Sequence, residues 1–504
     1  MRTITHFVTG NAWDGTSGNT QPVLNPSTGQ QQAAVALASA VDVDHVIAEA
    51  AKAQPGWAAL NPQKRIRIIM EWIRLIHANM DELARTLSLE HGKTFDDAKG
   101  DVLRGVDVLE FALGAPHQLK GEYSSEVGTG IDTYSLRQPL GVVAGITPFN
   151  FPAMIPLWKA GPALASGNAF VLKPSERDPS VPVRLAELFI EAGAPAGVFN
   201  VVHGGKEAVD AILDSETIQA VGFVGSSAIA QYIYSRCAET GKRAQCFGGA
   251  KNHAIVLPDA DINATADALV GAAYGSAGER CMALSVVVPV GQETADKLRD
   301  ALIAKIPGLK VGHCLDPEAD YGPLVTADAR DRVLRLIGEG VEAGADLLVD
   351  GRELDMSGET FDGESLGEGY YVGPTLFDNV SADMSIYTEE IFGPVLVIVR
   401  AETLEEAVSY PNDHVYGNGV AIFTQNGGAA RDFVKNVNVG MVGVNVPIPV
   451  PIAYHTFGGW KASGFGDLNQ HGPDSFRFYT KTKTVTSRWP DDSNAGPQFT
   501  MPVM

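Results

Sequence analysis

The sequence predicts an α/β protein with parallel, doubly wound sheets, and two observations lead to that class. From residue 141 onward, short β-rich runs alternate with helical stretches, and strands separated by helices of this length pair in parallel. The chain also has 504 residues, which is too long for one ordinary core and suggests two or three domains. Hydrophobic residues make up 45% and charged residues 19%, a balance typical of a folded globular protein.

Two segments before residue 160 are rich in apolar residues, and they predict different structures. Residues 139–158 contain four prolines and Asn150, and a lipid-exposed helix could not satisfy a backbone broken in this way. We therefore expect a buried strand followed by a structured turn, and no membrane span. Residues 62–86 carry apolar side chains at helical spacing, which predicts one packing helix. These side chains belong to Ile66, Ile69, Met70, Ile73, Ile76 and Met80.

Two series of strands and helices follow, and each predicts an α/β domain. The first contains the runs GVVAGIT, AFVLKPS, FNVVHGG, AVGFVGSS and AIVLPDA, and its helices are expected to end at Gly193 and Gly241. The second of these helices is expected to be capped by Ser226 or Ser227. The second series, past residue 285, contains SVVVPV, PVLVIVRA, GVAIFT and VGVNV.

The final segments extend beyond both series. KTKTVTSRW predicts a strand with no neighbour nearby in sequence, so it would join another subunit's sheet or a remote part of its own chain. Residues 491–504 are rich in Pro, Gly, Asp and Ser and are expected to form a loose tail.

Charge and cysteine usage exclude several classes of partner. Lys and Arg number 38 against 60 Asp and Glu, a net charge of −22 without a basic stripe, so a nucleic-acid backbone would be repelled. The four cysteines form neither a CxxC pair nor a metal spacing, and no apolar signal segment follows the start. These features favour a cytoplasmic protein without a metal, and we expect no membrane partner.

Cys281 is the candidate nucleophile. It lies in GSAGERCMALS, residues 275–285, where small residues leave room for a substrate and Arg280 directly precedes it. A neighbouring cation raises the thiolate fraction of a thiol whose ordinary pKa is about 8.5. Cys237, Cys246 and Cys314 are better interpreted as buried structural cysteines.

A nucleotide cofactor is indicated at two strand ends. Lys173 and Glu176 follow a predicted strand, and a carboxylate there suits ribose hydroxyls and repels a 2′-phosphate, which favours NAD over NADP. Gly225 and Ser226 lie at a predicted strand-to-helix turn, where helix amides can bind pyrophosphate. The chain has neither GxGxxG nor a Walker sequence, so phosphoryl transfer loses support. The alternative for the Lys-Glu pair is an ordinary solvated loop.

Five ordered motifs together resemble the NAD(P)-dependent aldehyde dehydrogenase superfamily. The resemblance implies an aldehyde-dehydrogenase-like α/β fold: a Rossmann-type NAD domain over 1–117 and 138–249, a catalytic domain over 250–447, and a small β oligomerisation element over 118–137 and 470–490. It also implies a homo-oligomer, either dimer or tetramer, in which the C-terminal strand crosses to a neighbouring subunit. The motifs are PFNFP at 148–152, LKPSE at 172–176, GFVGSS at 222–227, GERC at 278–281 and EEIFGPV at 389–395, and GGWKASGFG at 458–466 extends the match.

The resemblance also implies roles for individual residues. Cys281 matches the nucleophile, and Asn150 matches the amide that forms an oxyanion hole with the Cys281 backbone N–H. Lys173 and Glu176 match ligands of the adenosine ribose. The other implied cofactor-binding residues are Thr147, Phe149, Gly225 and Ser226, together with Glu390 at the nicotinamide ribose and Phe392 against the nicotinamide end.

One departure from the family pattern predicts the reaction. Most hydrolytic members carry a glutamate base four residues before the lysine of a GGK-like motif, and counting back from Lys251 gives Phe247. PFNFP, AKNH and an arginine before the nucleophile resemble a CoA-acylating subgroup, whose two substrate-carboxylate arginines correspond to Arg104 and Arg280. The resemblance thus implies NAD-dependent oxidation of a small semialdehyde, methylmalonate or malonate semialdehyde, with decarboxylation and acyl transfer from the cysteine thioester to CoA as co-substrate.

Two other functions stay open at this point. A hydrolytic aldehyde dehydrogenase could use another base, for example Glu279, and would release a free acid without CoA. A catalytically idle relative could serve as a binding or structural protein, although the retained cysteine, amide and cofactor residues argue against it.

Overall fold

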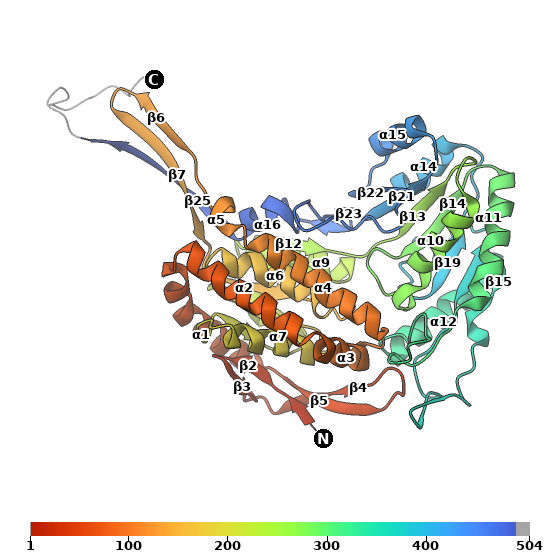
Figure 1. The fold of residues 1–504 in the computed structure, drawn as a ribbon, viewed down its shortest axis with the longest axis horizontal. Coiled ribbons are helices and arrows are strands. Elements are labelled where there is room, and N and C mark those ends of the chain that lie inside the picture. Colours follow the sequence, from red (N-terminus) through yellow and green to blue (C-terminus); the bar gives the residue numbers. More distant parts are fainter. Residues whose placement is uncertain (1, 490–504) are drawn as a thin grey trace.

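The computed structural model describes residues 2–489 and contains two α/β bodies and a projecting β arm (Figure 1). The predicted α/β class is confirmed. Within the described residues, no helix is both long and apolar enough to span a membrane. The predicted tail at 491–504 lies outside the described residues.

The first body is built on an eight-stranded sheet with the order β24-β12-β11-β8-β9-β10-β2-β3. Its five central strands, β12 to β10, pair in parallel, and antiparallel strands flank them, β24 on one side and β2 followed by β3 on the other. Every residue of β8, β9 and β10 is buried, as expected for strands covered by helices on both faces. The strands are β2 (His6–Val8), β3 (Asn11–Trp13), β8 (Val142–Ile146), β9 (Ala169–Lys173), β10 (Phe199–Val201), β11 (Ile218–Val224), β12 (Arg243–Phe247) and β24 (Gly464–Phe465).

Nine helices accompany this sheet along the chain, and a small separate sheet of order β1-β5-β4 lies at the N-terminal end. The helices are α1 (Ala40–Ala59), α2 (Pro62–Ala78), α3 (Met80–His91), α4 (Phe95–Ala112), α5 (Ala115–Gln118), α6 (Met154–Ala165), α7 (Ser180–Glu191), α8 (Lys206–Asp214) and α9 (Ser227–Glu239). The small sheet contains β1 (Arg2–Ile4), β4 (Asn19–Leu24) and β5 (Gln31–Leu37).

The second body is built on a seven-stranded sheet with the order β15-β18-β19-β14-β13-β21-β22, parallel except for β15. Its strands are β13 (Asn252–Val256), β14 (Leu284–Pro289), β15 (Asp346–Val349), β18 (Thr375–Asp378), β19 (Val395–Ile398), β21 (Gly419–Phe423) and β22 (Met441–Val444). Its helices are α10 (Ile262–Tyr274), α11 (Gln292–Lys305), α12 (Ala327–Glu342), α13 (Ser385–Thr388), α14 (Leu404–Asp413) and α15 (Gly427–Asn436). Short elements are η1 (Gly275–Gly278), η2 (Ile306–Gly308), η3 (Gly351–Glu353), β16 (Thr360–Phe361), β17 (Glu364–Ser365), β20 (Tyr416–Gly417) and β23 (Trp460–Lys461).

The arm is a three-stranded antiparallel sheet that extends away from both bodies (Figure 1). It consists of β6 (Tyr123–Gly128), β7 (Ile131–Pro139) and β25 (Thr480–Arg488), and β25 follows α16 (Gly472–Phe478). β25 pairs with β7 from Thr480 opposite Pro139 to Arg488 opposite Ile131. The final strand therefore pairs with a remote part of its own chain, which is one of the two partners expected.

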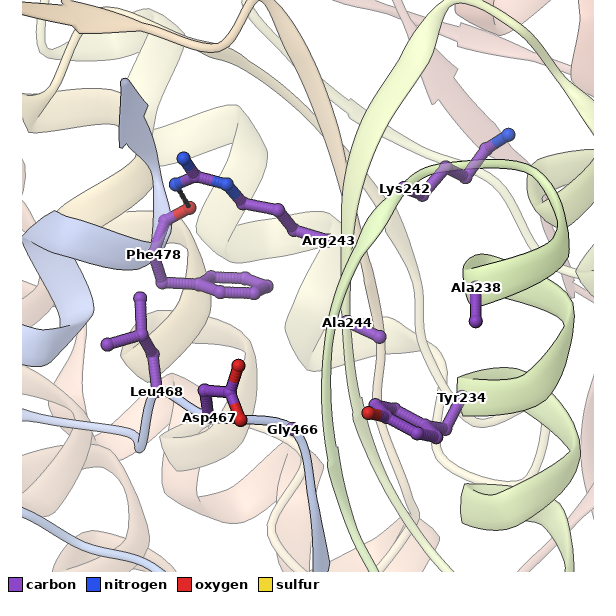
Figure 2. A pocket seen from close by; sticks show the side chains of 9 residues that line it. All are labelled: Tyr234, Ala238, Lys242, Arg243, Ala244, Gly466, Asp467, Leu468 and Phe478. Carbon is purple, nitrogen blue, oxygen red and sulfur yellow. Dashed lines mark hydrogen bonds between the residues drawn. The ribbon is translucent and has the colours of Figure 1, made fainter. Parts of the chain in front are cut away.

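Arg243 fastens the base of the arm to the first body. Its Nη1 donates to the carbonyl oxygens of Arg477, Phe478 and Thr480 at 2.9, 3.1 and 2.6 Å. Figure 2 shows this guanidinium reaching from β12 across a cavity of about 290 Å³ toward Phe478. The arginine satisfies carbonyls at the end of α16, where the helix leaves its last acceptors unpaired.

Three details differ from the sequence-based expectations. The single helix expected over 62–86 is two helices, because Asn79 leaves the helical conformation (φ −110°, ψ 19°) and its side chain donates to Leu75 O. Met70, expected on the packing face, is 52% exposed. Ser226 does occupy the N-cap of α9, but its side chain makes no capping hydrogen bond.

Candidate active site

A cavity of about 350 Å³ lies between the two bodies, and Cys281 is part of its wall. The turns after β8, β11 and β12 supply one side, so the cavity lies at the carboxyl ends of parallel strands, where open α/β sheets bind ligands. The cavity of Figure 2 contains no cysteine and lies at the start of the parallel strand β12 rather than at its carboxyl end, so the chemistry points to the first cavity. Its lining includes Phe149, Asn150, Gly225 and Ser226 of the first body and Cys281, Arg332, Glu390 and Phe392 of the second.

The turn before Cys281 has an unusual backbone. Ser276, Ala277 and Gly278 have φ values of 54°, 52° and 74°, three successive left-handed residues. At Gly278 a Cβ would lie 2.2 Å from the carbonyl oxygen of Gly393, so only glycine fits. Residues with a side chain rarely adopt this left-handed backbone conformation, and they keep it where the surrounding structure holds them in place. Here Asn252 and Asn418 each donate to the carbonyl oxygen of Cys281 at 3.0 Å.

The Asn150 amide is anchored and still has a free donor. Its Nδ2 donates to the carbonyl oxygen of Glu279 at 2.9 Å, two residues before Cys281. A primary amide carries two N–H groups, so one anchors the side chain and the second is available to the cavity that Asn150 lines. The structure therefore brings Asn150 and Cys281 together, as the sequence predicted.

The Cys281 thiol is not activated in the way the sequence suggested. Burial, followed by the nearby Glu390 charge, raises its pKa to about 12. Arg280, expected to favour the thiolate, instead donates to Asp97 Oδ1 at 2.6 Å. That expectation is wrong, because Arg280 is paired with a carboxylate on another element. Backbone N–H groups at Cys281 and Met282, and the charge of Lys93, act in the opposite direction to burial.

The remaining cysteines are all buried, as the sequence suggested. Burial raises the pKa of the thiols of Cys237 to about 12 and Cys314 to about 11, and raises that of Cys246 still further above its ordinary value. Cys281 is partly exposed and lines the cavity, whereas the other three are buried and do not line it, which leaves Cys281 as the candidate among the four.

The cofactor residues predicted from the sequence fit a dinucleotide. Thr147 carries a buried hydroxyl oxygen without a hydrogen-bond partner, and Ser226 leaves the first turn of α9 without a side-chain cap. Lys173 is the last residue of β9, and its Nζ lies 3.0 Å from Oε2 of Glu176 in the turn that follows. A backbone N–H cluster, an unpaired hydroxyl and a carboxylate are groups that bind phosphates and ribose.

Two cations that sequence reasoning did not assign fix the loop with Glu390 and Phe392. Lys251 donates to the carbonyl oxygens of Ile386 and Glu389, each at 2.7 Å. Arg332 donates to the carbonyl oxygens of Glu390 and Ile391. The position of Lys251 in GGAK was a usable signal, whereas nothing in the sequence near Arg332 indicated its role.

The two arginines predicted for a substrate carboxylate lie along one face of α4. Arg104 belongs to α4, and its guanidinium donates to Asp107 at 3.0 Å and to Pro451 O at 3.1 Å. Arg280 reaches α4 through Asp97, seven residues before Arg104. Seven residues are about two helical turns, which places both contacts on the same face about 10 Å apart along the axis. Each arginine has its own carboxylate partner, and they share none.

Phe247 gives the cavity an apolar neighbour where a hydrolytic base would be expected. The residue is buried at the end of β12, and its ring centroid lies 6.1 Å from that of Phe457. The Nζ atom of Lys159 lies 5.9 Å from the Phe247 ring and donates to Gln470 Oε1 at 3.2 Å. Burial lowers the Lys159 pKa to about 7, and nothing in the sequence indicated this buried amine.

Glu279, the alternative base, faces away from the thiol turn. Its carboxyl Oε1 accepts a long hydrogen bond from Val325 N at 3.4 Å, and Oε2 has no partner. Burial raises its pKa to about 8, so the group is largely protonated near neutral pH.

A doubly wound sheet whose strand ends meet a cysteine and an amide side chain can bind a nucleotide beside a candidate nucleophile. The comparison with known families identifies the class of protein. The chain belongs to the aldehyde dehydrogenase family, which matches residues 13–485. The predicted family is thereby confirmed.

Similar proteins cover essentially the whole chain. The chain is 51% identical to a malonate-semialdehyde dehydrogenase of Pseudomonas aeruginosa, with 100% of both chains covered. It is 44% identical to malonate-semialdehyde dehydrogenase 2 of Geobacillus kaustophilus, over 97% of this chain and 99% of the relative.

Solved structures are equally close. A crystal structure of a candidate methylmalonate-semialdehyde dehydrogenase from Sinorhizobium meliloti, complexed with NAD, superposes with a TM-score of 0.95 at 58% identity, covering 97% and 99% of the chains. The methylmalonate-semialdehyde dehydrogenase of Oceanimonas doudoroffii gives a TM-score of 0.95 at 49% identity, covering 98% and 99%.

Proposed function

We propose that this chain oxidises malonate semialdehyde or methylmalonate semialdehyde with NAD and transfers the shortened acyl group to CoA. The observation that carries the proposal is the pairing of Cys281 and Asn150 with an apolar Phe247 where a hydrolytic base would stand. The names of the similar proteins support the substrate, since they are malonate- and methylmalonate-semialdehyde dehydrogenases.

The first step is addition of the Cys281 sulfur to the aldehyde carbon. The resulting oxyanion accepts hydrogen bonds from the free N–H of Asn150 and from the Cys281 backbone N–H, which are fixed before the charge develops. A bound NAD supplies the hydride acceptor for this centre. The residues that would hold it are Thr147, Phe149, Lys173, Glu176, Gly225, Ser226, Glu390 and Phe392.

The second half of the reaction starts from a malonyl-type thioester on Cys281. The C–C bond to the β-carboxylate breaks, CO2 leaves, and the thioester carbonyl takes up the electron pair as an enolate that is then protonated on carbon. The CoA thiol attacks the thioester, and the Cys281 sulfur is the leaving group. The sum is OHC–CHR–COO⁻ + CoA–SH + NAD⁺ giving RCH2–CO–S–CoA + CO2 + NADH, which balances without a net proton.

The lack of a base at Phe247 suits CoA as acyl acceptor. Water needs a base to attack a thioester, whereas a thiol with a pKa near the working pH provides a strongly nucleophilic thiolate. The Phe247 and Phe457 rings pack together and offer no carboxylate that could act as a base toward water.

We further propose that Arg104 and Arg280 recognise the substrate carboxylate. Each guanidinium already makes an ion pair with an aspartate of α4, Arg104 with Asp107 and Arg280 with Asp97. A substrate carboxylate would share these guanidinium donors, since each has five N–H groups in a planar fork. Charge-assisted contacts of this kind are stronger than neutral ones.

Domain roles and assembly follow the same proposal. The eight-stranded body would bind NAD, the seven-stranded body would carry the catalytic cysteine, and the arm of β6, β7 and β25 would join subunits of a homo-oligomer, dimer or tetramer. The arm supports this assignment because only Thr480 among its strand residues is buried and the arm extends away from both bodies (Figure 1).

The decisive experiment is product analysis by mass spectrometry with both semialdehydes, in the presence and absence of CoA. We expect acetyl-CoA from malonate semialdehyde and propionyl-CoA from methylmalonate semialdehyde, each with CO2 and NADH. Free acid at full rate without CoA would instead identify a hydrolytic enzyme, with Glu279 as the first base to test.

A further inference from the structure

Lys93 is a buried cation beside the oxyanion site that the proposed reaction does not use. It lies in the turn between α3 and α4, and its side chain is 0% exposed. Its Nζ donates to the carbonyl oxygen of Asn150 at 2.7 Å and to Asp101 Oδ2 at 3.2 Å, and lies 4.2 Å from the centre of the Phe151 ring. Lysine is rarely buried completely unless it is paired, so this placement requires a reason.

The Lys93–Asp101 pair holds the turn that presents Asn150. The second carboxylate oxygen of Asp101 accepts the backbone N–H of Met154 at 2.7 Å, at the start of α6. The pair therefore contacts the turn between β8 and α6 at two points, Asn150 and Met154. From there the Asn150 amide reaches Glu279 O, so a continuous chain of contacts leads from Lys93 to the Cys281 turn.

Lys93 is also the cation whose field favours the Cys281 thiolate. Glu390 opposes it, and Arg280 is paired with Asp97. Around Lys93 the ionised partners are Asp97, whose pKa is lowered with Lys93 and Arg280 close by, and Asp101, whose pKa burial raises to about 6. Three other titratable groups that interact with Lys93 are largely neutral near pH 7, because burial lowers the pKa of His91 well below its usual value and raises that of Glu279 to about 8 and that of Asp178 well above its usual value.

We propose that Lys93 is a positioning residue of the oxyanion site, which fixes the Asn150 turn and places a buried positive charge that stabilises the Cys281 thiolate and the oxyanion formed from it. This inference rests on the proposed role of Cys281 as nucleophile. Lys93 then takes the part first expected of Arg280, because the Lys93 charge favours the Cys281 thiolate whereas Arg280 is paired with Asp97. A charge in a dry interior acts over a longer distance than one in water, because the effective dielectric constant there is lower.

The test measures how fast iodoacetamide alkylates Cys281 between pH 6 and pH 10, followed by mass spectrometry of the Cys281 peptide. Lys93→Met combined with Asp101→Asn removes both charges, and asparagine keeps an acceptor for Met154 N–H, so no buried charge is left unpaired. We expect alkylation at pH 8 to slow by about three- to tenfold and the NADH burst to slow at least as much. The dissociation constant of NAD should stay within about twofold, because most of the proposed cofactor residues, such as Glu176, Ser226 and Glu390, lie on other turns.

Asp101→Asn alone provides a test of opposite sign. It leaves Lys93 charged without its partner, so alkylation should be as fast as in the wild type or faster. A purely structural role would slow both variants alike, since both alter the same buried contacts. Lys99→Met is the matched control, because Lys99 belongs to α4, as Asp101 does, and its Nζ pairs with the exposed Asp81 at 2.8 Å.

Two results would overturn the inference. One is an equal alkylation rate in the wild type and the double variant, and the other is a slower rate in Asp101→Asn. The single variant also decides the question if the double variant does not fold. Alkylation needs neither CoA nor a semialdehyde, so failure of this inference is separate from failure of the proposed reaction.

Discussion

The two sides of Cys281 are built differently. On the side proposed for the cofactor, glycine-containing turns, the start of α9 and the Glu390 loop meet, and Lys251 and Arg332 bind four carbonyl oxygens of the loop. On the side proposed for the substrate, aromatic residues such as Phe247, Phe457 and Trp158 pack together, and Trp158 Nε1 donates to the carbonyl oxygen of Arg104.

The difference separates binding from chemical outcome. The cofactor side depends on backbone geometry that short motifs specify, so its residues could be named from the sequence. The substrate side depends on which distant side chains share a buried space, and there a single residue, Phe247, is expected to decide between water and a thiol. Four substitutions, from the largest expected effect to the smallest, test this division.

Cys281→Ala, at the boundary of the two sides, should reduce NADH formation by at least about a thousandfold while NAD still binds. Stopped-flow absorbance of NADH and calorimetric titration of NAD measure the two quantities. Cys314→Ala is the control, since Cys314 is buried away from the cavity and its loss should leave turnover near wild type. Retained turnover in Cys281→Ala would assign the nucleophile to another residue.

Phe247→Glu should convert part of the acyl transfer to hydrolysis. Burial will raise the pKa of the new carboxyl, whereas Lys159, 5.9 Å from the present ring, will lower it when charged. We expect CoA-independent acid formation to rise about tenfold or more, and to increase with pH as the carboxylate ionises.

Phe247→Leu separates the base from the lost ring, because it opens the same space without a carboxylate. If Phe247→Leu hydrolyses as fast as Phe247→Glu, space rather than a missing base controls the fate of the thioester. Wild-type enzyme should show a burst of NADH and then stall without CoA.

Arg104→Leu should raise KM for 3-oxo acids far more than for propanal, which has no carboxylate. A charge-assisted contact contributes about 1.5 to 3 kcal/mol, or roughly ten- to a hundredfold. Steady-state kinetics on both aldehydes measure the ratio, with the exposed Arg335→Leu on α12 as a control. Equal losses on both substrates would place Arg104 outside the carboxylate site.

Glu279→Gln should change stability more than activity. The pKa of Glu279 is raised from 4.5 to about 8, so the unfolded chain loses this proton first and wild-type stability falls as pH rises from about 4.5 to 8. Glutamine does not titrate, so the variant lacks that fall, and the difference in melting temperature between variant and wild type should grow from pH 6 to pH 8.5. This growth corresponds to a change in the relative free energy of unfolding on the order of 1 kcal/mol. A loss of CoA-independent acid formation in this variant would instead make Glu279 a hydrolytic base.

The sequence by itself determined the α/β class and the family, and it named several residues that line the cavity, such as Asn150 and Cys281, although not Arg332. Strand-end turns carry Gly225 and Ser226 wherever such a sheet forms, and the Cys281 and Asn150 motifs follow the chain locally. Helix 62–86 was predicted too long, because periodicity continues across Asn79 while the backbone does not. The domain boundaries and the residue roles stay predictions.

Only the tertiary structure decided the electrostatics. Arg280 is adjacent to Cys281 in sequence but is bound by Asp97, whereas Lys93, 188 positions earlier, contacts the Asn150 turn. The lowered pKa of Lys159, which lies near Phe247, could not be predicted from the sequence either, because it comes from burial among residues of several elements. A motif records the order and local geometry of the chain, but a charge acts through space, and its strength depends on which distant groups are buried around it.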